Sequence, residues 1–221
     1  MPPAKKPTRK ERDRQRNIDE ILRAAESVFA EQGYEGARMA DIAARAEFSV
    51  GYLYQTWDGK VDLYQSLLES KFKEFKSCVE GGIGSTTDPY QQINILIDAH
   101  VTFVEKNKEF AKIYLVETSP AERRAFNAVG SRLRKAHTAY IKLVAKIFEK
   151  GVDKGIFAPH PPRDLALALE GMIFEFAKDH FRNDPSGDLT DRIDVMKRIF
   201  FNPVLANYTK NTKNKKETRK P

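Results

Sequence analysis

Hydroxyl and amide side chains gather in one short segment of the sequence, around residue 50. Four of them lie within seven residues: Ser49, Tyr52, Tyr54 and Gln55. Groups of this kind form hydrogen bonds with phosphate oxygens and base edges. Between them, Val50 and Gly51 are small enough for the backbone to approach a duplex closely. The segment therefore predicts contact with nucleic acid, and Lys60, at the start of a following helix, predicts a further phosphate contact.

Nothing elsewhere in the sequence has the spacing of a catalytic or metal site. The four histidines are scattered, and we find no Gly-rich phosphate loop and no Ser or Cys nucleophile motif. Cys78 is the only cysteine, which rules out an internal disulfide and favours a reducing compartment. No segment has the roughly 20 apolar residues that spanning a membrane needs. We therefore expect a cytoplasmic protein that is not an enzyme and that holds no metal and no cofactor.

The net charge of +7 is concentrated at the two ends of the chain. Residues 1–16 hold seven basic and two acidic residues, a net charge of +5, and residues 207–221 hold six basic and one acidic residue, again +5. The remaining residues, 17–206, therefore carry a net charge of −3. Both ends are poor in large apolar residues, which predicts two flexible basic arms. Because residues 17–63 hold four basic and nine acidic residues, the N-terminal arm would supply much of any electrostatic attraction to DNA.

Apolar residues recur at helical spacing along almost the whole chain, and no stretch alternates as a strand does. These repeats and their capping residues predict nine helices, over residues 17–33, 39–46, 49–55, 60–80, 89–107, 110–116, 119–154, 164–182 and 190–201. The glycine-rich stretch at 81–87 predicts a linker. We therefore expect two helical domains, residues 17–80, whose last helix connects the domains, and residues 84–206.

The first domain contains the pattern of a helix-turn-helix, because residues 37–57 predict two short helices joined by a tight turn. The ordered features are Ile21-Leu22 through Phe29, Gly33-Tyr34, Asp41-Ile42-Ala43, Ser49-Val50-Gly51-Tyr52-Leu53-Tyr54, Trp57, Lys60 and Leu63. This pattern resembles the TetR family of bacterial transcriptional regulators over residues 17–63. Three positions depart from it: Arg38 or Met39 stands for a frequent Thr, Glu47 for a turn Gly, and Trp57 for Phe. Arg38 could add a DNA contact, and Glu47 requires a turn that avoids positive φ or tolerates it at a cost.

The resemblance implies an all-α protein, with an N-terminal three-helix DNA-binding domain and a C-terminal helical domain for ligand binding and dimerisation. It implies a homodimer on a palindromic operator in double-stranded DNA, most simply a repressor that a small-molecule ligand releases. The residues expected to contact DNA are Arg38, Ser49, Val50, Gly51, Tyr52, Tyr54, Gln55 and Lys60.

The second domain is rich in aromatic residues, which at helical spacing usually belong to the core. The ligand candidates are His100, Phe103, Tyr114, Tyr140 and Phe174, and an aromatic lining favours an apolar or aromatic effector. Residues 164–182 are apolar nearly all round, so this helix needs burial on two sides, toward a pocket and toward a partner subunit. By the resemblance, the last two helices form the dimer interface, with Leu169, Ile173, Phe176, Ile193, Met196 and Phe200 as candidates.

Two alternatives stay open. An activator or adaptor on the same fold would differ from a repressor in the position of its operator relative to the promoter. A small-molecule-binding or enzymatic helical protein with a vestigial helix-turn-helix would bind DNA without sequence preference and only at low salt.

Overall fold

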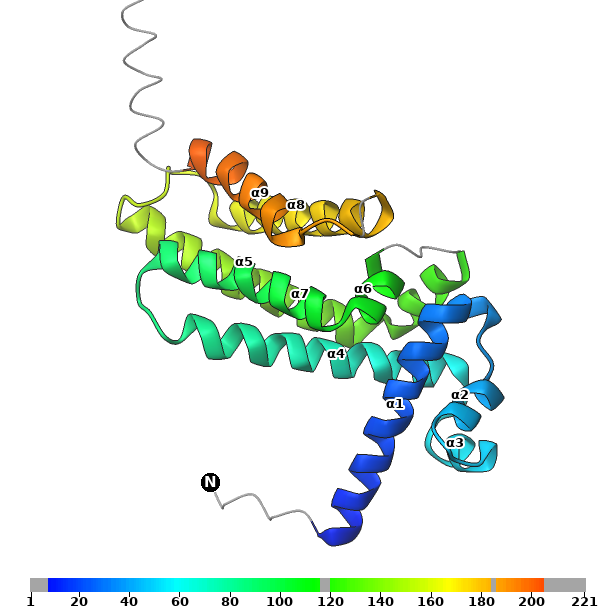
Figure 1. The fold of residues 1–221 in the computed structure, drawn as a ribbon. Helices are drawn as coiled ribbons and strands as arrows, with labels where there is room; N and C mark the ends of the chain where they lie inside the picture. The colour runs from blue at the N-terminus through cyan, green and yellow to red at the C-terminus, as the bar shows by residue number, and fades with distance from the viewer. Residues whose placement is uncertain (1–7, 116–119, 184–185, 205–221) are drawn as a thin grey trace, which may run out of the picture. The chain divides into compact units, whose positions relative to one another are not determined.

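The computed structural model describes residues 8–115, 120–183 and 186–204, with the backbone alone for 120–134 and Pro203 (Figure 1). Within these ranges it confirms the expected all-helical fold and contains no strand. The helices are α1 (Arg9–Gly36), α2 (Met39–Arg45), α3 (Val50–Thr56), α4 (Lys60–Ile83), α5 (Pro89–Lys106), α6 (Lys108–Leu115), α7 (Pro120–Asp153), α8 (Pro162–Asn183) and α9 (Leu189–Val204). No helix in these ranges is long and apolar enough to cross a membrane.

The chain divides into two compact units. Unit 1 comprises Met1–Lys71 with Lys112–Gly130, and unit 2 comprises Phe72–Ala111 with Ser131–Pro221. Their division falls inside α4, which continues without interruption from one unit into the other. The division also falls inside α6 and α7, so three helices have residues in both units.

The N-terminal arm is where the fold departs most from the sequence prediction. Residues 9–16, expected to be flexible, form the first turns of α1. Thr8 caps the helix, because its hydroxyl accepts a hydrogen bond from the Glu11 amide at 3.3 Å and its own amide donates to Glu11 Oε2 at 2.6 Å. Composition measures only the burial that a segment can gain, so it does not reveal this local cap. Residues 1–7 and the basic segment 207–221 lie outside the described residues.

The glycine-rich stretch also differs from the predicted linker, since α4 runs through Gly81 and Gly82 to Ile83. A Cβ at Gly82 would lie 2.6 Å from Ile95 Cγ2, so the missing side chain lets α4 and α5 pack closely in unit 2. The next helix begins as expected, with Asp88 Oδ1 accepting from the amides of Tyr90 at 2.8 Å and Gln91 at 3.1 Å. The connection between α4 and α5 is thus shorter than the glycine-rich composition of residues 81–87 predicts.

The core of unit 1 is formed by the apolar faces of α1 to α4. Its fully buried side chains include Ile21, Phe29, Ile42, Leu53, Leu63 and Leu67. Gly33, with φ of 70°, interrupts α1 where the sequence predicts its end, and Tyr34 then turns inward. The rings of Phe29, Tyr34 and Tyr64 lie 5.0–5.9 Å apart, so aromatic packing holds α4 against the end of α1.

The core of unit 2 is built mainly from α5, α7, α8 and α9. Its buried side chains include Ile93, Leu96, Ile97, Ile147, Phe148 and Phe157. Gly155, with φ of 68°, ends α7 where the sequence predicts a stop, and the amide of Ile156 donates to the Gly151 carbonyl at 2.8 Å. The chain then reverses so that Phe157 lies against Gly151, where a Cβ would be 2.1 Å from its ring.

Candidate nucleic-acid interface and ligand site

The turn between α2 and α3 is closed by the backbone. The amide of Ala46 donates to the Ile42 carbonyl at 2.9 Å, and that of Phe48 donates to the Ala43 carbonyl at 3.0 Å. Between them, Glu47 has φ of 60°, in the left-handed region that favours glycine. The turn therefore tolerates positive φ at a cost, the second of the two possibilities that the sequence leaves for Glu47.

Replacing Glu47 by glycine should stabilise unit 1. The left-handed conformation costs a residue with a side chain about 1–2 kcal/mol, and the greater freedom of glycine in the unfolded chain offsets part of this gain. We expect the free energy of unfolding in urea to rise by about 1 kcal/mol. The matched control is Ala44→Gly at an exposed helical position of α2, which should cost about 1 kcal/mol. A Glu47→Gly variant that is less stable than the parent would refute the strain.

Helix α3 has one buried anchor and a broad exposed face. Leu53 is fully buried, and Ser49 Oγ caps the helix by accepting from the Tyr52 amide at 3.2 Å. The DNA candidates on the outer side are all exposed: Ser49, Val50, Gly51, Tyr54 and Gln55. Tyr54, at 55% exposure, is the most exposed large hydrophobic side chain of this helix. The arrangement thus brings five of the predicted contact residues onto one solvent-facing surface, which we call the α3 face.

Tyr52, predicted as a contact, is mainly a brace for that surface. Its ring stacks on Phe48 with 5.1 Å between centroids, and its hydroxyl accepts a hydrogen bond from Asn17 Nδ2 at 3.2 Å. Asn17 lies on α1, so this bond ties the recognition segment to the first helix. The hydroxyl hydrogen of Tyr52 stays available as a donor to phosphate or base.

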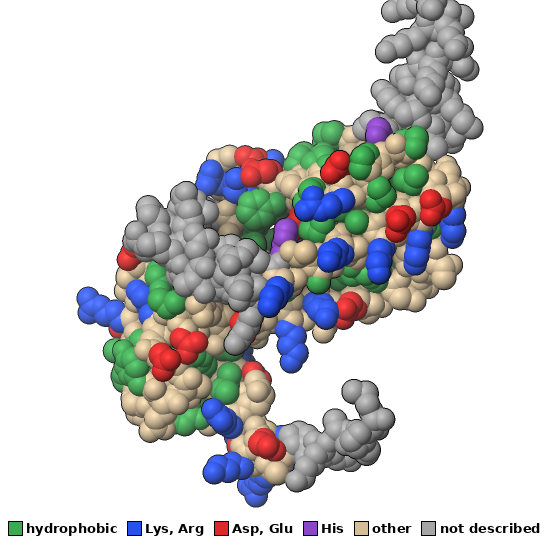
Figure 2. Space-filling model, turned by 180° about the vertical axis from the view of Figure 1, so that it is seen from behind, with side chains coloured by type: hydrophobic (Ala, Val, Ile, Leu, Met, Phe, Trp, Pro, Cys, Tyr) green, Lys and Arg blue, Asp and Glu red, His purple; other side chains and the backbone are tan. Residues whose placement is uncertain are grey.

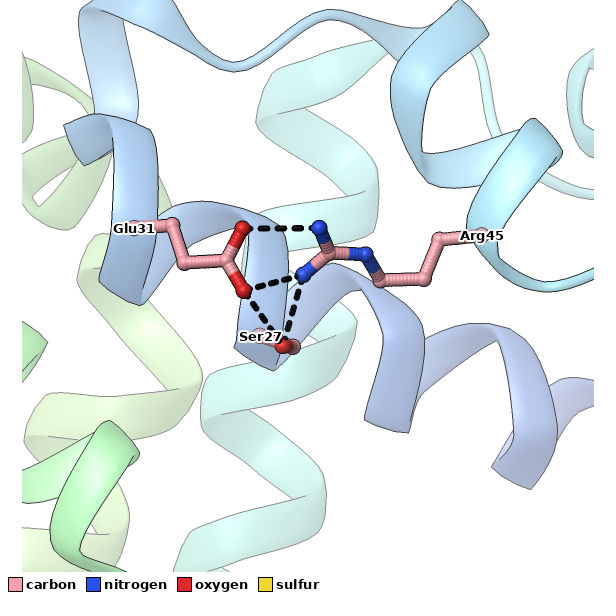
Figure 3. Close-up of polar contacts among 3 residues, drawn as sticks. All are labelled: Ser27, Glu31 and Arg45. Atoms are coloured by element: carbon pink, nitrogen blue, oxygen red, sulfur yellow. Dashed lines mark hydrogen bonds and ion pairs between the residues drawn. The ribbon is translucent and has the colours of Figure 1, made fainter.

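A second brace joins α2 to α1 (Figure 3). The Arg45 guanidinium forms two hydrogen bonds with the Glu31 carboxylate, at 2.5 and 2.7 Å, and one with Ser27 Oγ at 2.8 Å. These bonds hold the pKa of Glu31 below its usual value. The bidentate geometry fixes the orientation of α2, and therefore of the turn that leads into α3.

Lys60 has a role that the sequence does not predict. Its ammonium donates to the carbonyls of Tyr34, Glu35 and Ala37, at 2.6, 3.1 and 3.0 Å, and lies 4.7 Å from the centre of the Tyr34 ring. A lysine has three N–H donors, so all of them are committed to the end of α1. In this arrangement the Lys60 side chain caps α1 and holds α4 against it. The expected contact of Lys60 with a phosphate stays a prediction.

Substituting Lys60 by methionine should destabilise the protein without changing the salt dependence of DNA binding. The variant leaves three carbonyls without their charged donor, and we expect a loss of about 2 kcal/mol in urea unfolding. If Lys60 instead held a phosphate, its replacement would lower the slope of log affinity against log salt by about one. Lys73→Met, at an exposed position of α4, serves as the control and should stay within about 0.5 kcal/mol.

The first turns of α1 carry a dense basic surface. Arg9, Lys10, Arg12, Arg14 and Arg16 are all exposed, and Figure 2 shows blue side chains gathered at this end of the helix. Asp13 lies between them, 3.9 Å from Arg9 and 4.0 Å from Arg16. Residues 9–16 hold five basic and two acidic residues, a net charge of +3. We call these five side chains the α1 basic end; with exposed Arg38, they are the cationic part of the candidate interface.

In unit 2, three of the five ligand candidates come together. His100 and Phe103 of α5 and Tyr140 of α7 surround Phe75 of α4, with ring centroids 4.6, 5.3 and 5.6 Å from that of Phe75. We call these four residues the aromatic cluster. The sequence pattern puts Phe75 on the apolar side of its helix but does not mark it as a ligand candidate, because periodicity gives a face and no partner.

Burial controls the protonation of this cluster. His100 Nδ1 lies 2.8 Å from the Leu96 carbonyl, and Tyr140 Oη lies 3.1 Å from His100 Nε2. Burial lowers the pKa of His100 to about 4, so its ring is neutral at pH 7. Burial and the nearby Glu170 carboxylate raise the pKa of Tyr140 well above its usual value. Burial also raises the pKa of Glu170, which pairs with His137 at 2.8 and 3.0 Å, and this pairing opposes the rise.

The other two ligand candidates belong to different units. Tyr114 falls in the part of α6 that belongs to unit 1, and it is half-buried there. Phe174 of α8 is half-buried in unit 2, with Lys178 Nζ 5.7 Å from the centre of its ring.

The dimer candidates are mostly core residues. Leu169, Ile173, Ile193, Met196 and Phe200 are each no more than 5% exposed within the chain, which corrects their assignment to a partner surface; Phe176 is half-buried. When a helix is apolar all round, its sequence does not show which face packs against the core. The large apolar side chains that α8 and α9 expose among the described residues are instead Leu167, Val195 and Ile199, at 38%, 41% and 54%.

Two family models match the chain. Residues 21–67 match the bacterial regulatory proteins of the tetR family, and residues 86–178 match a tetracyclin repressor-like C-terminal domain. The first match covers all the residues of α2 and α3, and the second covers most of the described unit 2 residues up to α8.

Curated relatives and solved structures agree with these matches. The transcriptional activator FasR of Mycolicibacterium smegmatis is 27% identical over 165 residues, covering 75% of this chain and 72% of that protein. The transcriptional repressor KstR2 of Mycobacterium tuberculosis is 25% identical over 160 residues, covering 72% and 75%. The regulator FadR from Bacillus subtilis, solved in complex with stearoyl-CoA, has the same fold with a TM-score of 0.70, 21% identity and coverage of 85% of this chain and 98% of that chain.

Proposed function

Because the chain belongs to the TetR family of bacterial transcriptional regulators, we propose that it is a homodimeric repressor that a small molecule releases from a palindromic operator. Two α3 faces would enter successive major grooves, about 34–36 Å apart along the duplex. Such a protein acts on chromosomal DNA in the bacterial cytoplasm.

The observation that carries this proposal is the construction of the α3 face. A helix of only seven residues cannot hold its own orientation, and here α1, the turn and Leu53 fix it from behind. The bonds from Asn17 to Tyr52 and from Arg45 to Glu31 hold α3 and the preceding turn in place. The side chains of the α3 face therefore stay exposed to solvent. This division between braced and exposed residues suits a recognition helix better than a core helix.

Activation is the second candidate, and a relative favours it, since FasR is named as an activator while KstR2 is named as a repressor. The same α3 face serves both functions. The position of the operator separates them: a site that overlaps the promoter supports repression, and a site upstream of it supports activation or an adaptor role.

We assign effector binding to unit 2, around the aromatic cluster. FadR, which shares this fold, was solved in complex with stearoyl-CoA, a molecule with a long apolar chain. The cluster supports an apolar or aromatic ligand, because its rings offer apolar surface and few polar groups. Phe75 lies on α4, the helix that continues into unit 1, so a ligand that moves Phe75 would also move the end of α4 beneath α1. Ligand and operator would then compete through the position of α4.

The competition can be measured by fluorescence anisotropy of a labelled operator, with stearoyl-CoA as the first probe of a panel of apolar and aromatic compounds. Coupling of typically 1–3 kcal/mol predicts that a bound effector weakens operator affinity about 5- to 150-fold. Calorimetry establishes which probes bind. If a probe that saturates unit 2 leaves operator affinity unaltered, the release mechanism is wrong, and the regulator is controlled in another way.

For the dimer we propose the outer side of α8 and α9. Leu167, Val195 and Ile199 are apolar and exposed, and half-buried Phe176 lies on the same pair of helices. The inner sides of these helices are occupied by the core of unit 2, so only the outer side is available to a second copy.

A further inference from the structure

The hydrogen bonds of the aromatic cluster have a fixed direction. A carbonyl oxygen only accepts, so the bond between His100 Nδ1 and the Leu96 carbonyl requires the proton on Nδ1. The ring is neutral, and its Nε2 therefore carries a lone pair. The Tyr140 hydroxyl, 3.1 Å from Nε2, must be the donor in the second bond. The chain Tyr140 to His100 to Leu96 thus runs in one direction only.

This direction decides what Tyr140 can offer to a ligand. A phenolic hydroxyl has one hydrogen, and Tyr140 already donates it to His100 Nε2 in this hydrogen bond. The oxygen keeps its accepting capacity, so the Tyr140 hydroxyl can offer a ligand an acceptor and no donor. A carbonyl or carboxylate oxygen placed there would meet a lone pair and no donor.

The surrounding charge has the same preference. The Glu170 carboxylate acts on Tyr140 strongly enough to raise its pKa, so its negative charge is felt at the hydroxyl. His137 holds Glu170 from the side of α7, at 2.8 and 3.0 Å. A ligand donor would be attracted by this carboxylate, and an anionic ligand group would be repelled by it.

We infer that the effector presents a hydrogen-bond donor on an apolar body, a hydroxyl or an ammonium group, to the oxygen of Tyr140. This inference rests on the proposed ligand-binding function of unit 2 and specifies the polar chemistry of its ligand. Phe75 and Phe103 would pack on the apolar part, while a fatty-acid carboxylate or a simple ester would be selected against.

Four probes with the same C12 chain isolate the polar group: 1-dodecanol, dodecylamine, dodecyl methyl ether and dodecanoate. Each displaces the fluorescent reporter N-phenyl-1-naphthylamine from the full-length protein below its micelle concentration. We expect the alcohol or the ammonium to displace at about tenfold lower concentration than the ether and dodecanoate. Tenfold corresponds to about 1.4 kcal/mol, the contribution expected of one buried hydrogen bond. The alcohol and amine arms distinguish a hydroxyl effector from an ammonium effector.

Three variants test the direction of the bonds. Tyr140→Phe removes only the oxygen and should reduce the preference for donor probes to less than about threefold. His100→Leu releases the Tyr140 proton for a ligand, so the ether should gain relative to the alcohol; this variant also replaces Tyr140→Phe if that protein does not fold. Phe75→Leu is the control, which should weaken all four probes together and preserve their ratios.

Equal displacement by the ether or dodecanoate and the alcohol overturns the inference, and so does a preference that survives Tyr140→Phe. Failure of all four probes to displace the reporter also overturns it. Operator binding is measured on the same preparation, so that a failed probe pattern with intact operator binding is distinguished from failure of the DNA-binding function itself.

Discussion

Replacing the five side chains of the α1 basic end by glutamine should weaken operator binding about a hundredfold and flatten its dependence on salt. The physical reason is the charge of the rest of the DNA-binding region: residues 17–63 carry nine acidic and four basic residues and attract DNA poorly by themselves. The basic end supplies cations on a capped, regular helix that is continuous with the core of unit 1. Removing a cation from one phosphate lowers the slope of log affinity against log salt by about 0.9.

The variant joins Arg9→Gln, Lys10→Gln, Arg12→Gln, Arg14→Gln and Arg16→Gln, and it leaves Thr8 and Glu11 in place. Glutamine is a good helix former, so the helix itself should persist, which circular dichroism can check. The control removes three exposed lysines of α7 in unit 2: Lys142→Gln, Lys146→Gln and Lys150→Gln. This control should leave the salt slope nearly unchanged. An unchanged slope in the α1 variant would contradict a role of its basic end on DNA.

Loss of the outer side chains of α3 should have the second large effect. Tyr54→Ala combined with Gln55→Ala removes two exposed groups that reach phosphates or bases, each contributing about 1–3 kcal/mol. We expect operator affinity to fall at least a hundredfold in an anisotropy titration. Binding to unrelated DNA should change far less, because that binding depends on charge.

The stability of this double variant should stay close to that of the parent, since Tyr54 is 55% exposed and Leu53 remains as the anchor of α3. Val61→Ala, which removes an exposed apolar side chain from α4 in unit 1, is the matched control and should bind the operator normally. Operator affinity within about threefold of the parent in the double variant would remove α3 from the recognition surface.

Local signals predict the helices well. Ser49, Asp88 and Gly155 each act within one turn of their own position, so their spacing alone predicts a cap or a stop that the structure confirms. The α1 basic end shows the limit of composition, because a capping box at Thr8 begins α1 eight residues earlier than predicted, and residues 9–16 are all exposed.

Long-range pairings cannot be read from the sequence. Asn17 and Tyr52 are 35 positions apart, and Glu31 and Arg45 are 14 apart, with no periodicity that links them. The place of Lys60 in a motif predicts a phosphate contact, yet three carbonyls 23 to 26 positions away take its donors. For α8, the sequence shows two apolar sides without showing which one faces the core of unit 2.

The most direct test is a gel shift of the full-length protein with fragments of its own upstream genomic DNA, at physiological salt and with an excess of unrelated DNA. We expect one fragment to stay bound, with a palindromic footprint whose half-sites lie about 10 base pairs or a multiple of that apart. Binding that the unrelated DNA removes from every fragment equally, and that moderate salt abolishes, would contradict a sequence-specific regulator.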